Sequence, residues 1–269
     1  MDTVTAFILG LVQGITEFLP VSSSGHLVLV GEFLKQDSVN ALAFAAVLHL
    51  ASLGAVVIYF RSDIWSIFQV GIRKLSRLPV NEKDLTLLYA LLIGTIPAVV
   101  VGLSLESIIA LYLQVPAVVV VTLLVSSFFF MYAEWRYFVN PPQAQLTVKN
   151  GLLIGCFQVL ALAPGFSRSG ATIAGGMILG LTRVAAARFS FLLSIPVIAG
   201  AGLMKLVDLI AISETIAWWP IIVGTITSFV TALFVIHFFM AFLSKHTLWP
   251  FIWYKILLAV AVGYVVFIL

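Results

Sequence analysis

Apolar positions along the chain fall into stretches long enough to cross a membrane. A transmembrane helix needs about 20 predominantly apolar residues. Six stretches meet this requirement, at about 41–60, 85–104, 115–135, 184–206, 216–240 and 248–269. The pattern therefore predicts six transmembrane helices.

Two further apolar regions, 4–33 and 150–181, are broken near their middles by polar residues, glycine and proline, at 20–26 and 164–172. Irregular backbone at membrane depth is tolerated only where protein or a water-filled cavity surrounds it. Each region is therefore predicted to be a re-entrant hairpin of helix, break and helix. The predicted fold class is an all-α polytopic membrane protein with six transmembrane helices and two re-entrant helical hairpins.

The composition agrees with a membrane location. Of 269 residues, 62% are hydrophobic and only 9% are charged, whereas soluble domains carry about 25% charged residues. A cytosolic enzyme and a nucleic-acid-binding protein are thereby excluded. The single Cys156 rules out an internal disulfide and a multi-cysteine metal site.

The basic residues predict the orientation. Segment 61–84 contains five Lys and Arg residues, and the positive-inside rule places it in the cytoplasm. The loops predicted to lie on the opposite side, around 31–40, 105–114 and 207–215, are acidic, with Lys35 as their one basic residue. This alternation puts both termini outside, so the 20–26 break enters from the outer face and its pocket opens there.

The two broken regions resemble each other at an offset of 145 residues. Gly10, Gln13 and Ser22 match residues 155, 158 and 167, and LLIGTI at 91–96 later matches IIVGTI at 221–226. Each half then holds one hairpin and three spans. Because three is odd, the halves must be inverted relative to each other, as in many transporters. We predict a single membrane domain, 1–269, built from inverted structural repeats 1–140 and 146–269.

The first break carries the first group of candidate functional residues. Gln13 and Glu17 lie four residues apart, on one face of a helix, and Ser22, Ser23, Ser24 and His26 follow. A carboxylate in an apolar segment is costly, so it needs a partner, a cation or a function. The plain alternative is that Glu17 only pairs with an arginine from the other half of the chain.

The second break carries the second group, centred on Arg168, the only basic residue between positions 152 and 181. It is surrounded by small and hydroxyl residues, namely Gly165, Ser167, Ser169, Gly170 and Thr172. A guanidinium beside backbone amides at a helix start is well suited to phosphate oxygens. The alternative is a small-residue helix contact in which Arg168 binds a neighbouring helix.

Together the two breaks favour phosphoryl transfer. Arg168 and the amides would hold phosphate oxygens, Glu17 with Gln13 would bind a hard divalent cation, and a serine or His26 would supply the nucleophile or move a proton. Glu17 and Arg168 are expected to be the two deeply embedded charges. His49, in the apolar stretch 41–60, is interpreted as a packing histidine.

The motifs QGITEFLPVSSSGH and PGFSRSGAT, starting at Gln13 and Pro164, resemble the two conserved regions of the undecaprenyl pyrophosphate phosphatase family, also called the bacitracin-resistance protein family. The resemblance covers nearly the whole chain. It implies hydrolysis of undecaprenyl pyrophosphate to undecaprenyl phosphate and inorganic phosphate, which recycles the carrier lipid for cell-wall synthesis and confers bacitracin resistance. The implied location is the bacterial inner membrane.

The same resemblance implies roles for individual residues. Gln13 and Glu17 match a motif that binds Mg²⁺ or Ca²⁺, with Gln13 standing where many members have Glu. Ser23 matches the serine proposed as nucleophile and His26 the motif histidine. The pyrophosphate-binding loop is matched by Ser167, Arg168, Ser169 and Thr172.

Three questions stay open at this level. The sequence does not decide whether Ser23 or a metal-bound water attacks phosphorus. Inverted repeats also fit a transporter or flippase of polyprenyl phosphate, as an alternative or additional role. The expected partners are the polyprenyl pyrophosphate substrate and membrane lipids. The oligomeric state is the third open question, and a homodimer is one possibility.

Overall fold

The computed structural model of the chain is all-helical, and it describes residues 2–34, 38–105, 109, 113, 115–211 and 218–268. Within the predicted acidic outer loops, residues 35–37, 106–108, 110–112, 114 and 212–215 lie outside the described part, Lys35 among them. The helices are α1 (Thr3–Thr16), α2 (Ser23–Phe33), α3 (Ser38–Tyr59), α4 (Arg61–Leu75), α5 (Glu82–Ser104), α7 (Pro116–Val139), α8 (Val148–Val159), a 3-10 turn η2 (Leu160–Leu162), α9 (Arg168–Ile178), α10 (Arg183–Ala211), α11 (Trp218–Leu243) and α12 (Trp249–Ile268).

Five of the described helices, α5, α7, α10, α11 and α12, are each long and apolar enough to cross a membrane. A sixth candidate is the pair formed by Phe44–Tyr59 and Arg61–Leu75, which meet at an angle of 79°. The prediction of an all-helical, multi-pass membrane protein is therefore confirmed, with five to six candidate spans among the described residues.

Helix α4 was not expected, since segment 61–84 was interpreted only as a cytoplasmic connection. It is amphipathic: Trp65, Phe68, Ile72 and Leu75 are exposed and follow helical spacing along one side. An ion pair between Asp63 and Arg188 joins α4 to α10. The segment was interpreted from its basic residues alone, so the helical spacing of its apolar residues was not recognised.

Several helices begin at a side-chain cap. The Asp2 side chain accepts from the Thr5 backbone N–H at 2.9 Å. In the same way, Asn81 accepts from Lys83 at 2.9 Å, and Thr147 accepts from Asn150 at 3.1 Å. These caps satisfy amide groups that have no partner within the helix. The bonds from the Thr5 amide and hydroxyl also lower the pKa of the Asp2 carboxyl.

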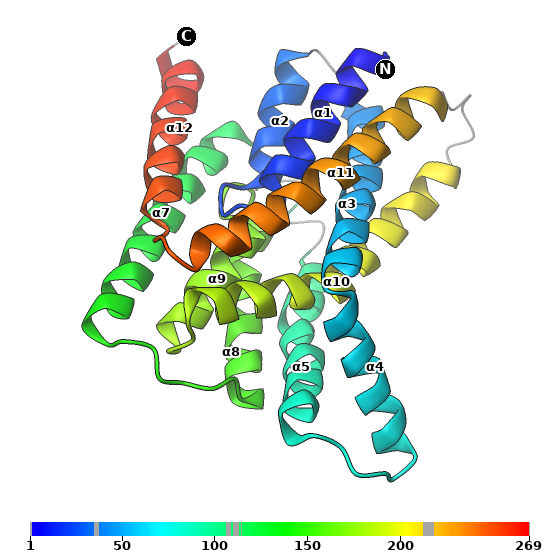
Figure 1. Ribbon diagram of the computed structural model, residues 1–269. Helices are drawn as coiled ribbons and strands as arrows, with labels where there is room; N and C mark the ends of the chain where they lie inside the picture. The colour runs from blue at the N-terminus through cyan, green and yellow to red at the C-terminus, as the bar shows by residue number, and fades with distance from the viewer. Residues whose placement is uncertain are drawn as a thin grey trace.

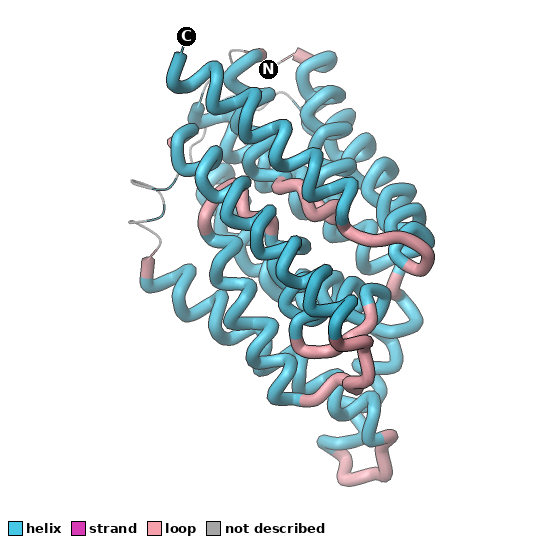
Figure 2. The backbone as a smooth tube through the Cα atoms, turned by 90° about the vertical axis from the view of Figure 1, so that its left-hand side faces the viewer, coloured by secondary structure: helices cyan, strands magenta, loops and turns pink. Residues whose placement is uncertain are grey.

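The two broken regions form pairs of short helices. Helices α1 and α2 contain 14 and 11 residues, and α8 and α9 contain 12 and 11, too few for a span of about 20 residues. In Figure 1, α1 and α2 reach the centre of the molecule from the end where both termini lie, and α8 reaches it from the opposite end. Figure 2 shows loop segments in the interior, between layers of helices.

Glycines allow the short helices to pack closely against long ones. A Cβ atom on Gly10 of α1 would lie 2.6 Å from the Gly224 carbonyl oxygen of α11. A Cβ atom on Gly155 of α8 would lie closer still to the Gly94 carbonyl oxygen of α5. Small residues at such contacts let helix backbones approach each other in a membrane, and here they fix α1 and α8 against the long helices α11 and α5.

We expect Gly155→Leu to destabilise the protein by about 1–3 kcal/mol or more, because the new side chain forces α8 away from α5. Thermal unfolding of the purified protein in detergent measures the change. The control is Gly200→Ala in α10, where no described heavy atom lies within 4 Å of the added Cβ. An unchanged midpoint for Gly155→Leu would contradict the close contact.

Candidate active site

The structure brings the two breaks into direct contact. The Gly165 backbone N–H donates to the Ser22 hydroxyl at 3.0 Å, and the Ser169 hydroxyl donates to the Leu19 carbonyl at 3.1 Å. The Arg168 guanidinium bonds the Glu17 carboxylate at 2.7 Å. Three hydrogen bonds thus join segments that are more than 140 residues apart in the sequence.

Corresponding serines turn the backbone at the two breaks. Ser22 has a φ of 74° and Ser167 has a φ of 76°, a left-handed conformation that is uncommon for residues other than glycine. Their hydroxyls accept backbone hydrogen bonds, Ser22 from Gly165 and Ser167 from Gly170 at 3.1 Å. Such strained positions concentrate at functional sites, where surrounding contacts hold them.

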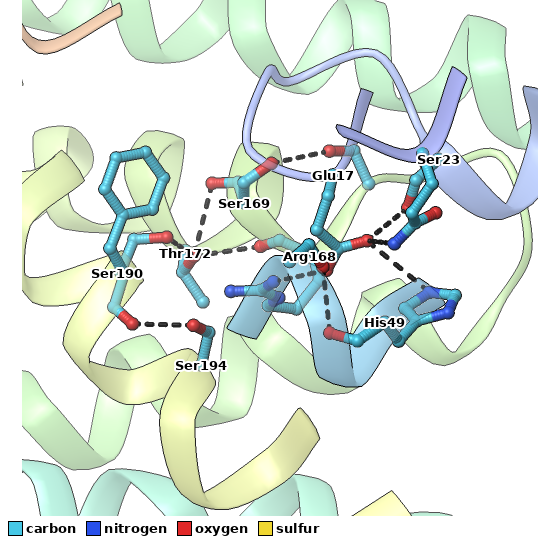
Figure 3. Close-up of polar contacts among 12 residues, drawn as sticks. Glu17, Ser23, His49, Arg168, Ser169, Thr172, Ser190 and Ser194 are labelled. Atoms are coloured by element: carbon cyan, nitrogen blue, oxygen red, sulfur yellow. Dashed lines mark hydrogen bonds and ion pairs between the residues drawn. The ribbon is translucent and has the colours of Figure 1, made fainter. Parts of the chain in front are cut away.

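Glu17 lies at the centre of the cluster (Figure 3), and its side chain is only 5% exposed. One carboxylate oxygen, Oε1, accepts from Arg168. The other, Oε2, accepts from the Ser23 hydroxyl at 2.7 Å and from the Gln13 amide at 2.9 Å. A buried carboxylate is stable only when it is paired and hydrogen-bonded, and these three donors meet that need.

Arg168 begins α9 and has a guanidinium with two different environments. Its NH2 group donates to Glu17, whereas its buried NH1 group has no hydrogen-bond partner among the residues that the structure describes. The guanidinium carbon lies 5.9 Å from the centre of the Phe18 ring. One edge of the guanidinium is therefore available to an anion at the start of a helix, where the helix dipole also favours negative charge.

Hydroxyl side chains lie close to Arg168, at the start of α9 and on the neighbouring helix α10. Thr172 donates to the Arg168 carbonyl at 2.8 Å, and its oxygen lies 2.6 Å from the Ser190 hydroxyl. Ser167 and Ser169 have their hydroxyl oxygens 3.1 Å apart. Ser190 was not predicted, because nothing in its apolar span marks it until the fold places it beside Thr172.

Ser24 is exposed, and its hydroxyl oxygen lies 3.4 Å from that of Ser22.

His26 contacts a different part of the molecule. Its Nδ1 lies 2.8 Å from the Ser22 carbonyl oxygen, and its Nε2 lies 2.6 Å from the Tyr254 hydroxyl on α12. The carbonyl can only accept, so Nδ1 carries hydrogen, and in the neutral ring Nε2 accepts from Tyr254. Within the described part of the chain, no hydrogen bond joins His26 to Glu17 or Arg168. Its catalytic role stays a prediction, and sequence reasoning missed Tyr254.

Lys255 and Glu134 are buried ionisable residues in addition to the two that were expected. Lys255 is fully buried, and its Nζ donates to the Phe166 carbonyl at 3.1 Å and to the Ser126 hydroxyl. It also lies 4.4 Å from the centre of the Phe130 ring. Lys255 thus joins α12 and α7 to the second break. A lone lysine seven residues into an apolar span was a sequence signal for a buried partner.

His49 also enters the cluster, although it was interpreted as a packing histidine. Its Nε2 lies 3.4 Å from Oε2 of Glu17 (Figure 3). The repeat pattern brings α3 near α1, but only the fold shows that His49 faces the carboxylate.

The donors around Glu17 are few for a metal site. No group of three or more His, Cys, Asp and Glu side chains able to hold a metal occurs among the described residues. Glu17 nevertheless supplies a carboxylate, and the buried Gln13 has a side-chain oxygen with no partner in that part of the chain. Mg²⁺ commonly binds through one or two carboxylates plus substrate phosphates, so this donor set fits such an ion.

Fold and site together define a multi-pass membrane protein with an ion-paired polar cluster enclosed among apolar helices. The sequence matches the family described as "Bacitracin resistance protein BacA" over residues 6–261. The chain belongs to this family.

Full-length relatives agree with that assignment. The chain is 40% identical over 260 residues to a protein from Chromohalobacter salexigens, with 97% of each chain covered. It is 43% identical over 263 residues to one from Kineococcus radiotolerans, covering 97% of this chain and 93% of that protein. A third, from Idiomarina loihiensis, is 38% identical over 263 residues, with 97% of each covered. All three are named "Undecaprenyl-diphosphatase".

Proposed function

We propose that the protein is an undecaprenyl-diphosphatase that hydrolyses undecaprenyl pyrophosphate to undecaprenyl phosphate and inorganic phosphate, and thereby contributes to bacitracin resistance. The observation that carries the proposal is the buried NH1 group of Arg168, which has no partner among the described residues and lies on the same guanidinium that bonds Glu17. The substrate is that of the named relatives.

Arg168 binds the pyrophosphate while staying bonded to Glu17. Its planar guanidinium presents separate N–H groups to two acceptors, so NH2 contacts Glu17 and NH1 contacts a phosphate oxygen. The start of α9 adds the partial positive charge of a helix N-terminus. The site is enclosed among apolar helices, within reach of a substrate whose lipid stem stays in the membrane.

Ser23 is the candidate nucleophile because its hydroxyl donates to Glu17 at 2.7 Å. A nucleophile bonded to a base that a third group orients is the usual arrangement for covalent catalysis, and Arg168 orients Glu17. Ser23 oxygen would bond the terminal phosphorus, its proton would pass to Glu17, and the bond to the bridging oxygen would break and release undecaprenyl phosphate. Water then cleaves the phosphoserine to inorganic phosphate. Direct attack by water, with Glu17 as base, is the alternative.

Gln13 and Glu17 are the candidate ligands of Mg²⁺ or Ca²⁺. The cation would neutralise charge on the pyrophosphate oxygens. The unpartnered oxygen of Gln13, in the described part of the structure, supports this assignment.

The finer architecture is proposed together with the function. The two broken regions are re-entrant hairpins of inverted repeats, with both termini and the pocket on the outer side of a bacterial inner membrane. Two contacts support the repeat: α1 packs on α11 through Gly10 and Gly224, and α8 packs on α5 through Gly155 and Gly94. Gly10 corresponds to Gly155 at the offset of 145 residues, and Gly94 corresponds to Gly224 at the offset of 130 residues. The two contacts are therefore equivalent, and each hairpin packs against the other half of the chain.

The orientation is tested with Arg77→Cys, in the exposed loop after α4, in a Cys156→Ala background. We expect an impermeant thiol reagent to label it only after the inner face of the membrane is exposed, because basic segments stay in the cytoplasm. Labelling from the outside of intact cells would contradict the topology.

The function is tested with Arg168 variants in detergent. We expect Arg168→Ala to lower phosphate release from undecaprenyl pyrophosphate by about 10²–10³-fold or more, as when one donor aimed at developing charge is removed. Arg168→Lys should also lose activity, since a single ammonium cannot replace the two-sided guanidinium. Arg73→Ala, on the surface of α4, is the matched control. Wild-type rates in both Arg168 variants would contradict the proposal.

A further inference from the structure

Helix α4 turns sharply away from the helix before it and exposes a row of apolar side chains. Its axis makes an angle of 79° with Phe44–Tyr59 of α3, and its far end lies opposite the two termini (Figure 1). Trp65, Phe68 and Ile72 follow helical spacing along one face, and all three are exposed. Large apolar side chains that form such a row mark a surface that meets a membrane or a partner.

The opposite face of α4 packs against the rest of the protein. Val70 is buried there, and the Ser66 hydroxyl donates to the Asp84 carboxylate at the start of α5 at 3.3 Å. Asp63 pairs with Arg188 of α10. Helix α5 is itself a candidate membrane span with exposed apolar side chains. The apolar row of α4 therefore faces away from the protein, beside a helix that is apolar enough to lie in lipid.

Basic side chains gather at the end of α4 and in the loop that follows it. Arg73, Lys74 and Arg77 are exposed, and the ion pairs among the described residues do not include them. Segment 73–84 carries four basic residues against two acidic ones, Glu82 and Asp84, which leaves a net charge of +2. The end of α4 thus combines an apolar face with positive charge.

Arg77 occupies a backbone position at which glycine is usual. Its φ is 58°, in the left-handed region that a side chain strains. The helix ends here in a Schellman motif, in which the Leu78 amide donates to the Arg73 carbonyl at 2.8 Å and the Arg77 amide donates to the Lys74 carbonyl at 3.1 Å. An arginine at such a strained position indicates that its charge has a use.

We propose that α4 is an interfacial helix that binds anionic phospholipids. Its apolar row enters the acyl region, and Arg73, Lys74 and Arg77 pair with the headgroup phosphates. An apolar face bordered by Lys and Arg is typical of a helix that lies in the membrane surface. In the proposed orientation α4 is on the cytoplasmic side, where anionic lipids make the membrane surface negative. The proposal is independent of the phosphatase reaction, because these residues lie outside the candidate active site.

Native mass spectrometry of the full-length protein tests the lipid class, with equal amounts of phosphatidylglycerol and phosphatidylcholine added in detergent. We expect phosphatidylglycerol to bind more tightly. Arg77→Gly should weaken its binding by about fivefold, which corresponds to about 1 kcal/mol per basic residue near the surface. The same change should leave the thermal unfolding midpoint unchanged or raise it, because glycine relieves the left-handed position.

The matched control is Lys149→Gln, which removes an exposed charge at the start of α8, on the same predicted side of the membrane. This variant should bind phosphatidylglycerol as the wild type does. Equal binding of the two lipids by the wild type, or equal losses in Arg77→Gly and Lys149→Gln, would overturn the proposal.

Spin labels attached in Phe68→Cys and Gln69→Cys, each in a Cys156→Ala background, test where α4 lies in vesicles that contain phosphatidylglycerol. The two positions are about 100° apart around the helix. We expect oxygen, which concentrates in the acyl region, to relax the label at position 68, and a water-soluble nickel reagent to relax the label at position 69. A label at position 68 that the nickel reagent relaxes would place the apolar row in water, as for a soluble partner, and would contradict the proposal.

Discussion

The ion pair between Glu17 and Arg168 is the interaction on which the site depends. It joins two segments that are 151 residues apart, through a 2.7 Å bond between side chains that are 5% and 14% exposed. Removing one partner of a buried pair leaves an uncompensated charge and costs about 3–5 kcal/mol. The remaining bonds to Glu17, from Ser23 and Gln13, complete the stabilisation of its charge. The side chains that stabilise the contact between the two breaks are also the proposed catalytic groups. Stability and function therefore depend on the same cluster.

The surrounding helices make this pair possible by fixing where the two breaks meet. Close contacts of α1 with α11 and of α8 with α5, at Gly10 and Gly155, fix the position of each short helix against a long one. Lys255 then bonds the Phe166 carbonyl, directly before the left-handed Ser167. The backbone at the start of α9 is therefore held from two sides. A rigid support of this kind is what a binding or catalytic group needs to keep its geometry.

Most of the fold could be predicted from hydrophobic length, because membrane spans obey a single strong constraint. Glu17 and Arg168 were found for the same reason, as charges in apolar surroundings. Helix α4 was missed because its charges dominated the interpretation. His49 and Ser190 were missed because their importance comes from contacts with other helices, at Glu17 and Thr172. Tyr254 pairs with a residue 228 positions away, a distance at which one sequence without an alignment carries no information.

A double-mutant cycle between Glu17 and Arg168 tests the central claim most directly. Glu17→Gln, Arg168→Gln and the double variant are compared by thermal unfolding in detergent. Because each single change leaves the other charge buried and unpaired, the account predicts a double variant whose loss of stability is smaller than the sum of the single losses, by about 1 kcal/mol or more. Losses that simply add would mean that the two side chains do not interact, and would contradict the account.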